Sequence, residues 1–172
     1  MYHHAILQCT QAFMTIETML DKAEKLAALK SFDVNVLMHS RLAPDMQPFV
    51  YQVQSASDYL KGGAAWLSGQ KPPRMEDTEK TIDEVRARVR KTVEFTQSVT
   101  EDQYTNAGEQ QIKVSWVPGK VILGRDYLLQ MVIPNVYFHI GMAYAILRKD
   151  GVDVGKLDFL GPMNFIDSAD LP

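Results

Sequence analysis

The chain has 172 residues, of which 46% are hydrophobic and 23% are charged, and its net charge at neutral pH is −3. This length suits one domain spanning residues 1–172, large enough to fold around its own core. A single cysteine excludes an internal disulfide framework, the acidic charge balance argues against nucleic-acid binding, and no apolar run is long enough to cross a membrane. The first residues also lack the pattern of a signal peptide, so we expect a soluble, cytoplasmic protein.

The first predicted element is a long helix over Tyr2–Lys30. Its apolar side chains recur at helical spacing, and neither glycine nor proline interrupts them. Cys9 lies on this apolar stripe and is therefore interpreted as a small core side chain rather than a reactive thiol. A turn and a short helical stretch, Val34–His39, follow.

A second helix is expected to begin with a first turn that holds Pro44 and Asp45 and to run to about Ser68, with a Gly62–Gly63 pair inside it. The pair is either a weak point in the helix or a place where another helix approaches closely. Beyond it, Pro72 and Pro73 indicate an extended linker.

The third helix is predicted to begin at a capping box, Thr81–Glu84, and to end near Ser98. Several basic residues alternate with acidic ones along it, which is typical of a solvated face. These basic residues are Arg86, Arg88, Arg90 and Lys91.

The segment before the last helix has a different character. Alternation over Gln111–Trp116, a turn at Pro118–Gly119 and the apolar run Val121–Leu123 predict a small β-hairpin. The last helix should span Asp126–Lys149, with a kink at Pro134 because proline removes one backbone donor. These elements together predict an all-α fold, an antiparallel up-and-down four-helix bundle with a small β-hairpin before the last helix.

The last helix carries the most informative polar pair. Asn135 and His139 are four residues apart inside an apolar stripe, so they share one surface and must find polar partners there. Two interpretations remain open. The pair lines a site in the bundle core where the imidazole binds a metal or exchanges a proton, or it forms a buried hydrogen bond to a neighbouring helix.

The second helix offers further candidates for such a pocket. Its polar candidates are Gln52, Ser55 and Asp58, and its aromatic side chains on the face away from the apolar stripe are Tyr51, Tyr59 and Trp66. These polar side chains face a pocket only if this helix is buried on both sides. The aromatic face is equally suited to a dimer interface. His3, His4 and His39 are interpreted as surface histidines, so tight binding of a transition metal is not expected.

Several motifs resemble one known family. The two longest are Arg41-Leu-Ala-Pro-Asp-Met46 and Pro134-Asn-Val-Tyr-Phe-His139, and shorter matches such as Asp58-Tyr-Leu-Lys61 and Gly151-Val-Asp-Val-Gly-Lys156 extend along nearly the whole chain. The chain resembles the domain-of-unknown-function family nineteen ninety-three, which groups with the DinB/YfiT-like bundles. The resemblance implies a DinB-type four-helix bundle that is often dimeric.

The resemblance also implies a chemistry to look for. Many DinB-like proteins hold a divalent metal between one histidine of the second helix and an HxxxH pair of the last helix, and some are thiol-dependent transferases. In this register His139 matches the second histidine of the pair, whereas Asn135 stands at the first and the second-helix histidine falls near Ser55. The chain keeps one of three expected ligands, which implies a degenerate metal site.

Two functional hypotheses follow. The first is a small-molecule-binding or homodimeric module with a remodelled pocket formed by Asn135, His139, Gln52 and Asp58. The second is a transferase or hydrolase that uses the pocket around His139 and depends weakly on a divalent metal or on a thiol. In both, His139 is the one metal ligand predicted, and neither nucleic acid nor a membrane is expected as a partner.

Overall fold

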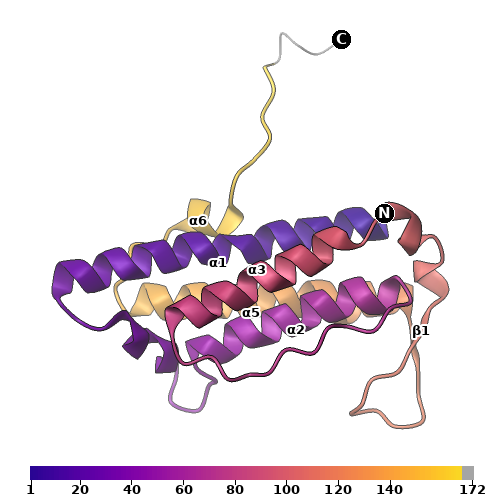
Figure 1. Cartoon of the computed structure of the whole chain (residues 1–172), viewed down its shortest axis with the longest axis horizontal. Helices are drawn as coiled ribbons and strands as arrows, with labels where there is room; N and C mark the ends of the chain where they lie inside the picture. The colour runs from indigo at the N-terminus through magenta and orange to yellow at the C-terminus, as the bar shows by residue number, and fades with distance from the viewer. Residues whose placement is uncertain (168–172) are drawn as a thin grey trace.

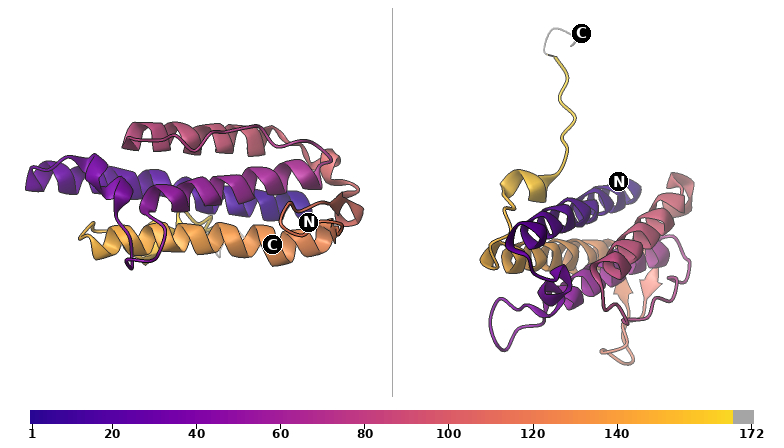
Figure 2. Two further views of the ribbon diagram at one scale, coloured as in Figure 1. Left: turned by 90° about the horizontal axis from the view of Figure 1, so that it is seen from below. Right: turned by 60° about the vertical axis from the view of Figure 1, so that its left-hand side comes forward.

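The computed structural model describes residues 1–167, and four long helices make up about half of it (Figure 1). They are α1 (Tyr2–Lys30), α2 (Phe49–Leu67), α3 (Ile82–Ser98) and α5 (Ile133–Lys149). α1 and α2 lie between α3 and α5, as Figure 2 shows. The apolar stripes of these helices meet in one core, so the predicted all-α fold class is confirmed.

Shorter elements connect and cap the long helices. They are the 3₁₀-helices η1 (Val34–His39), η2 (Glu101–Tyr104) and η3 (Ala107–Glu109), the strands β1 (Gln111–Ile112) and β2 (Ile122–Leu123), and the helices α4 (Gly124–Tyr127) and α6 (Lys156–Leu160). The two strands pair antiparallel, with Gln111 opposite Leu123, which confirms the hairpin in a shorter form than the alternation indicated. In α6 the Asp158 carboxylate accepts a hydrogen bond from the amide of Gly155 at 2.7 Å and pairs with Lys22 at 2.6 Å.

The four long helices do not alternate strictly in direction. α1 and α3 are antiparallel, because Thr10 contacts Thr96 while Glu17 pairs with Arg86. The segment 69–80 returns along the bundle after α2 (Figure 1), so α3 begins beside η1, where its first amide donates to the Asn35 side chain at 2.9 Å. α2 and α3 therefore run in the same direction, which departs from the strict up-and-down order that was expected.

Local sequence signals explain where the third helix begins. The predicted capping box is present, since the amide of Thr81 donates to the Glu84 carboxylate at 3.0 Å and the amide of Glu84 donates to the Thr81 hydroxyl at 3.3 Å. These two bonds satisfy backbone donors that the first turn of a helix leaves unpaired. The start of α3 is therefore determined by residues next to it in sequence.

The Gly62–Gly63 pair marks a close approach between helices. A Cβ atom at Gly63 would lie 2.6 Å from Cγ1 of Val132 and 3.3 Å from Cδ1 of Ile6. Of the two interpretations that the sequence left open, the structure therefore supports close packing at Gly63. Cys9 lies in the same core, where burial raises the pKa of its thiol to about 11, as expected for a structural cysteine.

The kink expected at Pro134 takes the form of a wider helical turn. Residues Leu128–Val132 form a π-helical turn, η4, between α4 and α5. Proline cannot donate a backbone hydrogen bond, and a π turn is one way for a helix to accommodate such a loss. The side-chain amide of Asn135 donates to the carbonyl of Met131 at 2.7 Å, and so helps to satisfy the backbone of this turn.

The basic residues of α3 depart from the prediction of a solvated face. Arg88 is buried, with its side chain 2% exposed, and it pairs with Glu79 at 2.7 Å, Asp77 at 2.7 Å and Asp58 at 3.0 Å. Two of these acids belong to the returning segment 69–80, whose position the charge pattern of α3 does not reveal. The solvated-face interpretation is therefore wrong for Arg88.

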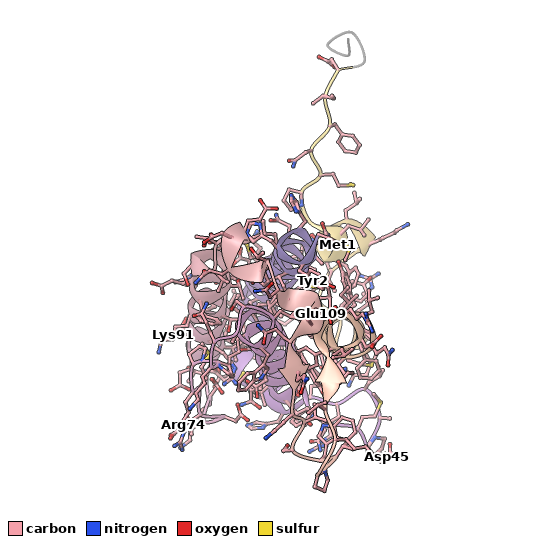
Figure 3. The ribbon with its side chains drawn as sticks, turned by 90° about the vertical axis from the view of Figure 1, so that its right-hand side faces the viewer. Met1, Tyr2, Asp45, Arg74, Lys91 and Glu109 are labelled. Atoms are coloured by element: carbon pink, nitrogen blue, oxygen red, sulfur yellow. The ribbon has the colours of Figure 1, made fainter. Side chains whose placement is uncertain are left out.

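One end of the bundle is closed by the elements that follow α3. Figure 3 looks at this end, with Tyr2 and Glu109 near each other and Arg74 and Lys91 on the side of α3. The Tyr2 hydroxyl covers Gly108 so closely that a Cβ atom there would lie 2.6 Å from it.

Within residues 1–167, no helix has both the length and the apolar character needed to cross a membrane.

Candidate functional site

His139 projects from α5 toward α2, and a buried glutamine holds its ring. Nδ1 of His139 lies 2.8 Å from Oε1 of Gln52, and Gln52 is 3% exposed. The amide nitrogen of Gln52 donates to the carbonyl of Gln47 at 3.0 Å. That second bond orients the amide, because it requires the nitrogen to face Gln47 and the oxygen to face the imidazole.

This contact determines the tautomer of the imidazole, and burial determines its charge. An amide oxygen can only accept, so Nδ1 of His139 carries the proton and donates it to Gln52. Burial lowers the pKa of His139 below its ordinary value of 6.5, so the ring is neutral at neutral pH. Nε2 therefore keeps its lone pair, and among residues 1–167 the hydrogen bond of the ring is the one that Nδ1 makes with Gln52.

Aromatic rings surround the imidazole. Tyr59 is stacked on it with ring centroids 5.9 Å apart and an interplanar angle of 18°, whereas Tyr51 and Phe138 approach edge-on at 6.3 and 5.2 Å. Tyr51 and Phe138 are 42% and 54% exposed. The arrangement combines one oriented hydrogen-bond acceptor with flat apolar surfaces, a pattern that suits an organic ligand.

The structure brings together two of the four residues predicted for the pocket. Gln52 and His139 are in direct contact. Asn135 instead bonds to its own helix at Met131, and Asp58 is half exposed and paired with Lys61 and Arg88. The side chains of Asn135 and Asp58 are thus engaged in separate structural networks.

The residues around His139 do not fit a resident metal ion. A histidine-type site needs three or four ligands at suitable distances, and neither Asn135 nor Ser55 offers a strong donor at the positions where the resemblance implies histidines. In the part of the chain that the structure describes, the one group of three His, Cys, Asp or Glu side chains close enough to share an ion comprises His3, His4 and Glu101. That group does not include His139.

A cleft lies beside this centre. Its volume is about 440 Å³, and Tyr59, which stacks on His139, forms part of its wall. Aromatic side chains from α2, α4 and the loop of the hairpin complete the wall, namely Trp66, Tyr127 and Trp116. Asp58 and Lys61 line it as well, so the predicted Asp58 faces the cleft rather than the imidazole.

Tyr127 and Trp116 were not among the sequence candidates. Their position depends on how the hairpin loop folds over α2, which no local pattern encodes. Burial raises the pKa of Tyr127 to about 12, so its phenol is neutral.

A larger groove of about 700 Å³ runs between residues 73–79 and α3, but Glu79 and Arg88, which line it, are already paired with each other.

Comparisons with known proteins agree with this architecture. A crystal structure described as a DinB family member from Shewanella denitrificans superposes with a TM-score of 0.92 at 38% sequence identity, covering 96% of this chain and 94% of that one. No curated protein matches the chain. The family model for DUF1993, a domain of unknown function, matches residues 1–160. This match covers most of the sequence and agrees with the helical fold, so the chain belongs to the DUF1993 family.

Proposed function

We propose that this protein binds a small organic molecule between His139 and the adjoining aromatic cleft. The observation that carries the proposal is the imidazole of His139, which is neutral, oriented by Gln52 at 2.8 Å and left with an unpaired Nε2. An oriented acceptor of this kind is suited to a ligand that offers a hydroxyl, amine or thiol hydrogen.

The cleft supplies the apolar part of the site. A volume of about 440 Å³ lies within the range of small-molecule sites, which are mostly apolar with a few placed polar groups. His139 is not itself part of the cleft wall, but Tyr59 borders both the cleft and the imidazole, so a ligand in the cleft would extend past this ring to reach the histidine. The charged side chains of the lining are Lys61, Lys113 and Asp58, and because Asp58 pairs with Lys61, the charge of Lys113 is left to favour a neutral or anionic ligand.

Intrinsic fluorescence tests the proposal directly. The chain has two tryptophans, Trp66 and Trp116, and both line the cleft. A panel of neutral and anionic aromatic compounds, with low-molecular-weight thiols included, would be titrated while tryptophan emission is recorded. We expect a compound that changes the emission saturably, with an affinity at least about tenfold weaker in His139→Ala, which corresponds to loss of one hydrogen bond.

The matched control is His39→Ala, because His39 is exposed and lies in η1, before α2. This variant should bind like the unaltered chain. Equal binding by His139→Ala would place the ligand away from the imidazole and would contradict the proposal. Turnover of a thiol compound that requires His139 would instead favour the transferase hypothesis, with Nε2 as the base.

A homodimer is the second candidate, and exposed aromatic side chains favour it. Tyr51 and Phe138 flank His139 and are largely solvent-exposed in the single chain, and aromatic residues are enriched where chains associate. Sedimentation analysis of the unaltered chain and of Phe138→Asp tests this candidate. A dimer that dissociates in the variant supports it, whereas a monomer at all concentrations contradicts it.

A further inference from the structure

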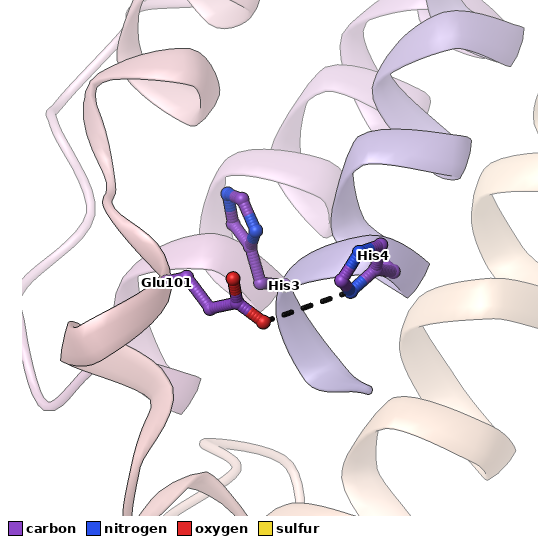
Figure 4. Close-up of side chains that lie close together, drawn as sticks. All are labelled: His3, His4 and Glu101. Carbon is purple, nitrogen blue, oxygen red and sulfur yellow. Dashed lines mark ion pairs between the residues drawn. The ribbon is translucent and has the colours of Figure 1, made fainter.

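Three metal-binding side chains meet at one end of the bundle, far along the chain from the family position at His139. His3 and His4 belong to the first turn of α1, and Glu101 is the first residue of η2. Their potential ligand atoms all lie within 4.8 Å of one another, and Nδ1 of His4 is 3.8 Å from Oε1 of Glu101. Figure 4 shows the carboxylate extending from η2 toward the two histidines.

The backbone around these side chains is well anchored. Val99 and Tyr104, on either side of Glu101, are 1% and 4% exposed. The amide of Thr100 donates to the side chain of Gln103 at 2.8 Å, which caps the start of η2. The ring of Tyr104 also packs on that of His3, with centroids 5.7 Å apart. The two segments are thus held against each other by packing that does not involve His4 or Glu101.

One imidazole in the group lacks a partner. Nδ1 of His3 is buried and makes no hydrogen bond with any of residues 1–167. The hydroxyl of Tyr104 is also buried and without a hydrogen-bond partner among these residues, and burial raises the pKa of that phenol to about 12. A buried polar atom without a partner costs free energy, and coordination to a cation would satisfy the imidazole nitrogen.

The donor types indicate which cation fits. Two imidazoles and one carboxylate suit zinc and the neighbouring divalent transition metals, whereas magnesium and calcium prefer oxygen ligands. Tetrahedral zinc would need its ligand atoms about 3.3 Å apart. His4 and Glu101 have side chains 72% and 66% exposed, so both are free to close the remaining distance by changing rotamer.

We propose that His3, His4 and Glu101 form a binding site for a zinc-class divalent cation, with water in the fourth coordination position. The charge of Glu101 opposes the positive end of the α1 dipole, which would otherwise disfavour a cation there. A bound ion links the start of α1 to η2, and therefore stabilises the folded chain in proportion to its occupancy.

The site is tested with zinc and cobalt alone, on the full chain without a histidine tag. Calorimetry with Zn²⁺ should give one site per chain, and Co²⁺ should develop the visible absorption bands of a tetrahedral ion. In His4→Ala and in Glu101→Gln we expect Zn²⁺ affinity to fall at least about tenfold. Both side chains are exposed, so these variants should fold, and circular dichroism verifies that they do.

Two control variants separate this site from other histidines. His39→Ala removes an exposed imidazole elsewhere, and His139→Gln removes the ligand at the family position; both should bind Zn²⁺ like the unaltered chain. The proposal is overturned if Zn²⁺ shows no saturable binding, if both site variants bind normally, or if binding is lost in His139→Gln instead.

Discussion

At the scale of single residues, His139 is the clearest example of a side chain whose chemistry is decided by its partner. Gln52 accepts from Nδ1 at 2.8 Å, so one nitrogen of the imidazole is committed to structure and the other is left for a ligand. The contact with Gln52 is open to a neutral or a charged ring, and it is burial that favours the neutral form, because it lowers the pKa of His139.

This environment predicts how stability depends on pH. Burial lowers the pKa of His139 in the folded chain below the ordinary value of 6.5, so between these two values the unfolded chain binds more protons. The free energy of unfolding should therefore rise with pH through this window and fall as the solution is acidified below about pH 6.5, with a slope of at most about 1.4 kcal/mol per pH unit. Urea unfolding at a series of pH values measures this slope.

The matched comparison is His139→Gln against His39→Gln. The slope should decrease in His139→Gln and persist in His39→Gln, because His39 is exposed. The carboxylates of Glu79 and Asp158 also have lowered pKa values, but their ordinary values are 4.5 and 3.8, so their effect begins at lower pH. An unchanged slope in His139→Gln would show that the imidazole is not desolvated in the folded chain.

At the scale of elements, α2 packs against the π-helical turn η4 just before α5. This packing helps to fix the axial position of α2 relative to α5, and with it the contact between Gln52 and His139. Gly63 packs closely against Val132 in this contact. We expect Gly63→Ala to lower the free energy of unfolding by about 1–3 kcal/mol, because the added methyl would lie 2.6 Å from Cγ1 of a rigid, buried valine. Equilibrium unfolding in urea measures the change.

Gly62→Ala is the matched control, since the nearest atom to its added Cβ would be the Tyr127 hydroxyl at an ordinary 3.4 Å. Alanine favours the helix over glycine by up to about 1 kcal/mol, so this variant should be as stable as the unaltered chain or more so. Val132→Ala should restore part of the stability lost in Gly63→Ala. If Gly63→Ala alone is neutral, the two helices are not in the close contact described here.

At the scale of the whole molecule, the sequence predicts those features that residues close together in the chain encode. Apolar periodicity gave the bounds of α1, and the Thr81–Glu84 pair gave the start of α3. The partner of His139 depends on the rotation and axial position of α2 relative to α5, which no pattern within one helix contains. Arg88 was misjudged for the same reason, because two of its partners lie in a returning segment without periodicity.

The returning segment gives Arg88 its role in the whole fold. Because α2 and α3 run in the same direction, residues 69–80 must cross the length of the bundle, and they contain no helix or strand. Arg88 holds them by pairing with Asp77 and Glu79 and by donating to the carbonyl of Glu76 at 3.2 Å, and it joins them to α2 through Asp58. One buried guanidinium thus connects α3, α2 and the segment between them.

Replacing this guanidinium should loosen the segment as well as the fold. Arg88→Met keeps most of the length of the side chain and removes its charge. Glu79 would then be left largely buried without its cation, so we expect the free energy of unfolding to fall by about 3 kcal/mol. Protease should also cleave within residues 73–79 faster than in the unaltered chain. Arg90→Met is the control, because Arg90 is 72% exposed and pairs with Glu17 at the surface; it should change stability by less than about 1 kcal/mol. Equal stability and equal cleavage in the two variants would mean that packing, and not Arg88, holds the segment against the bundle.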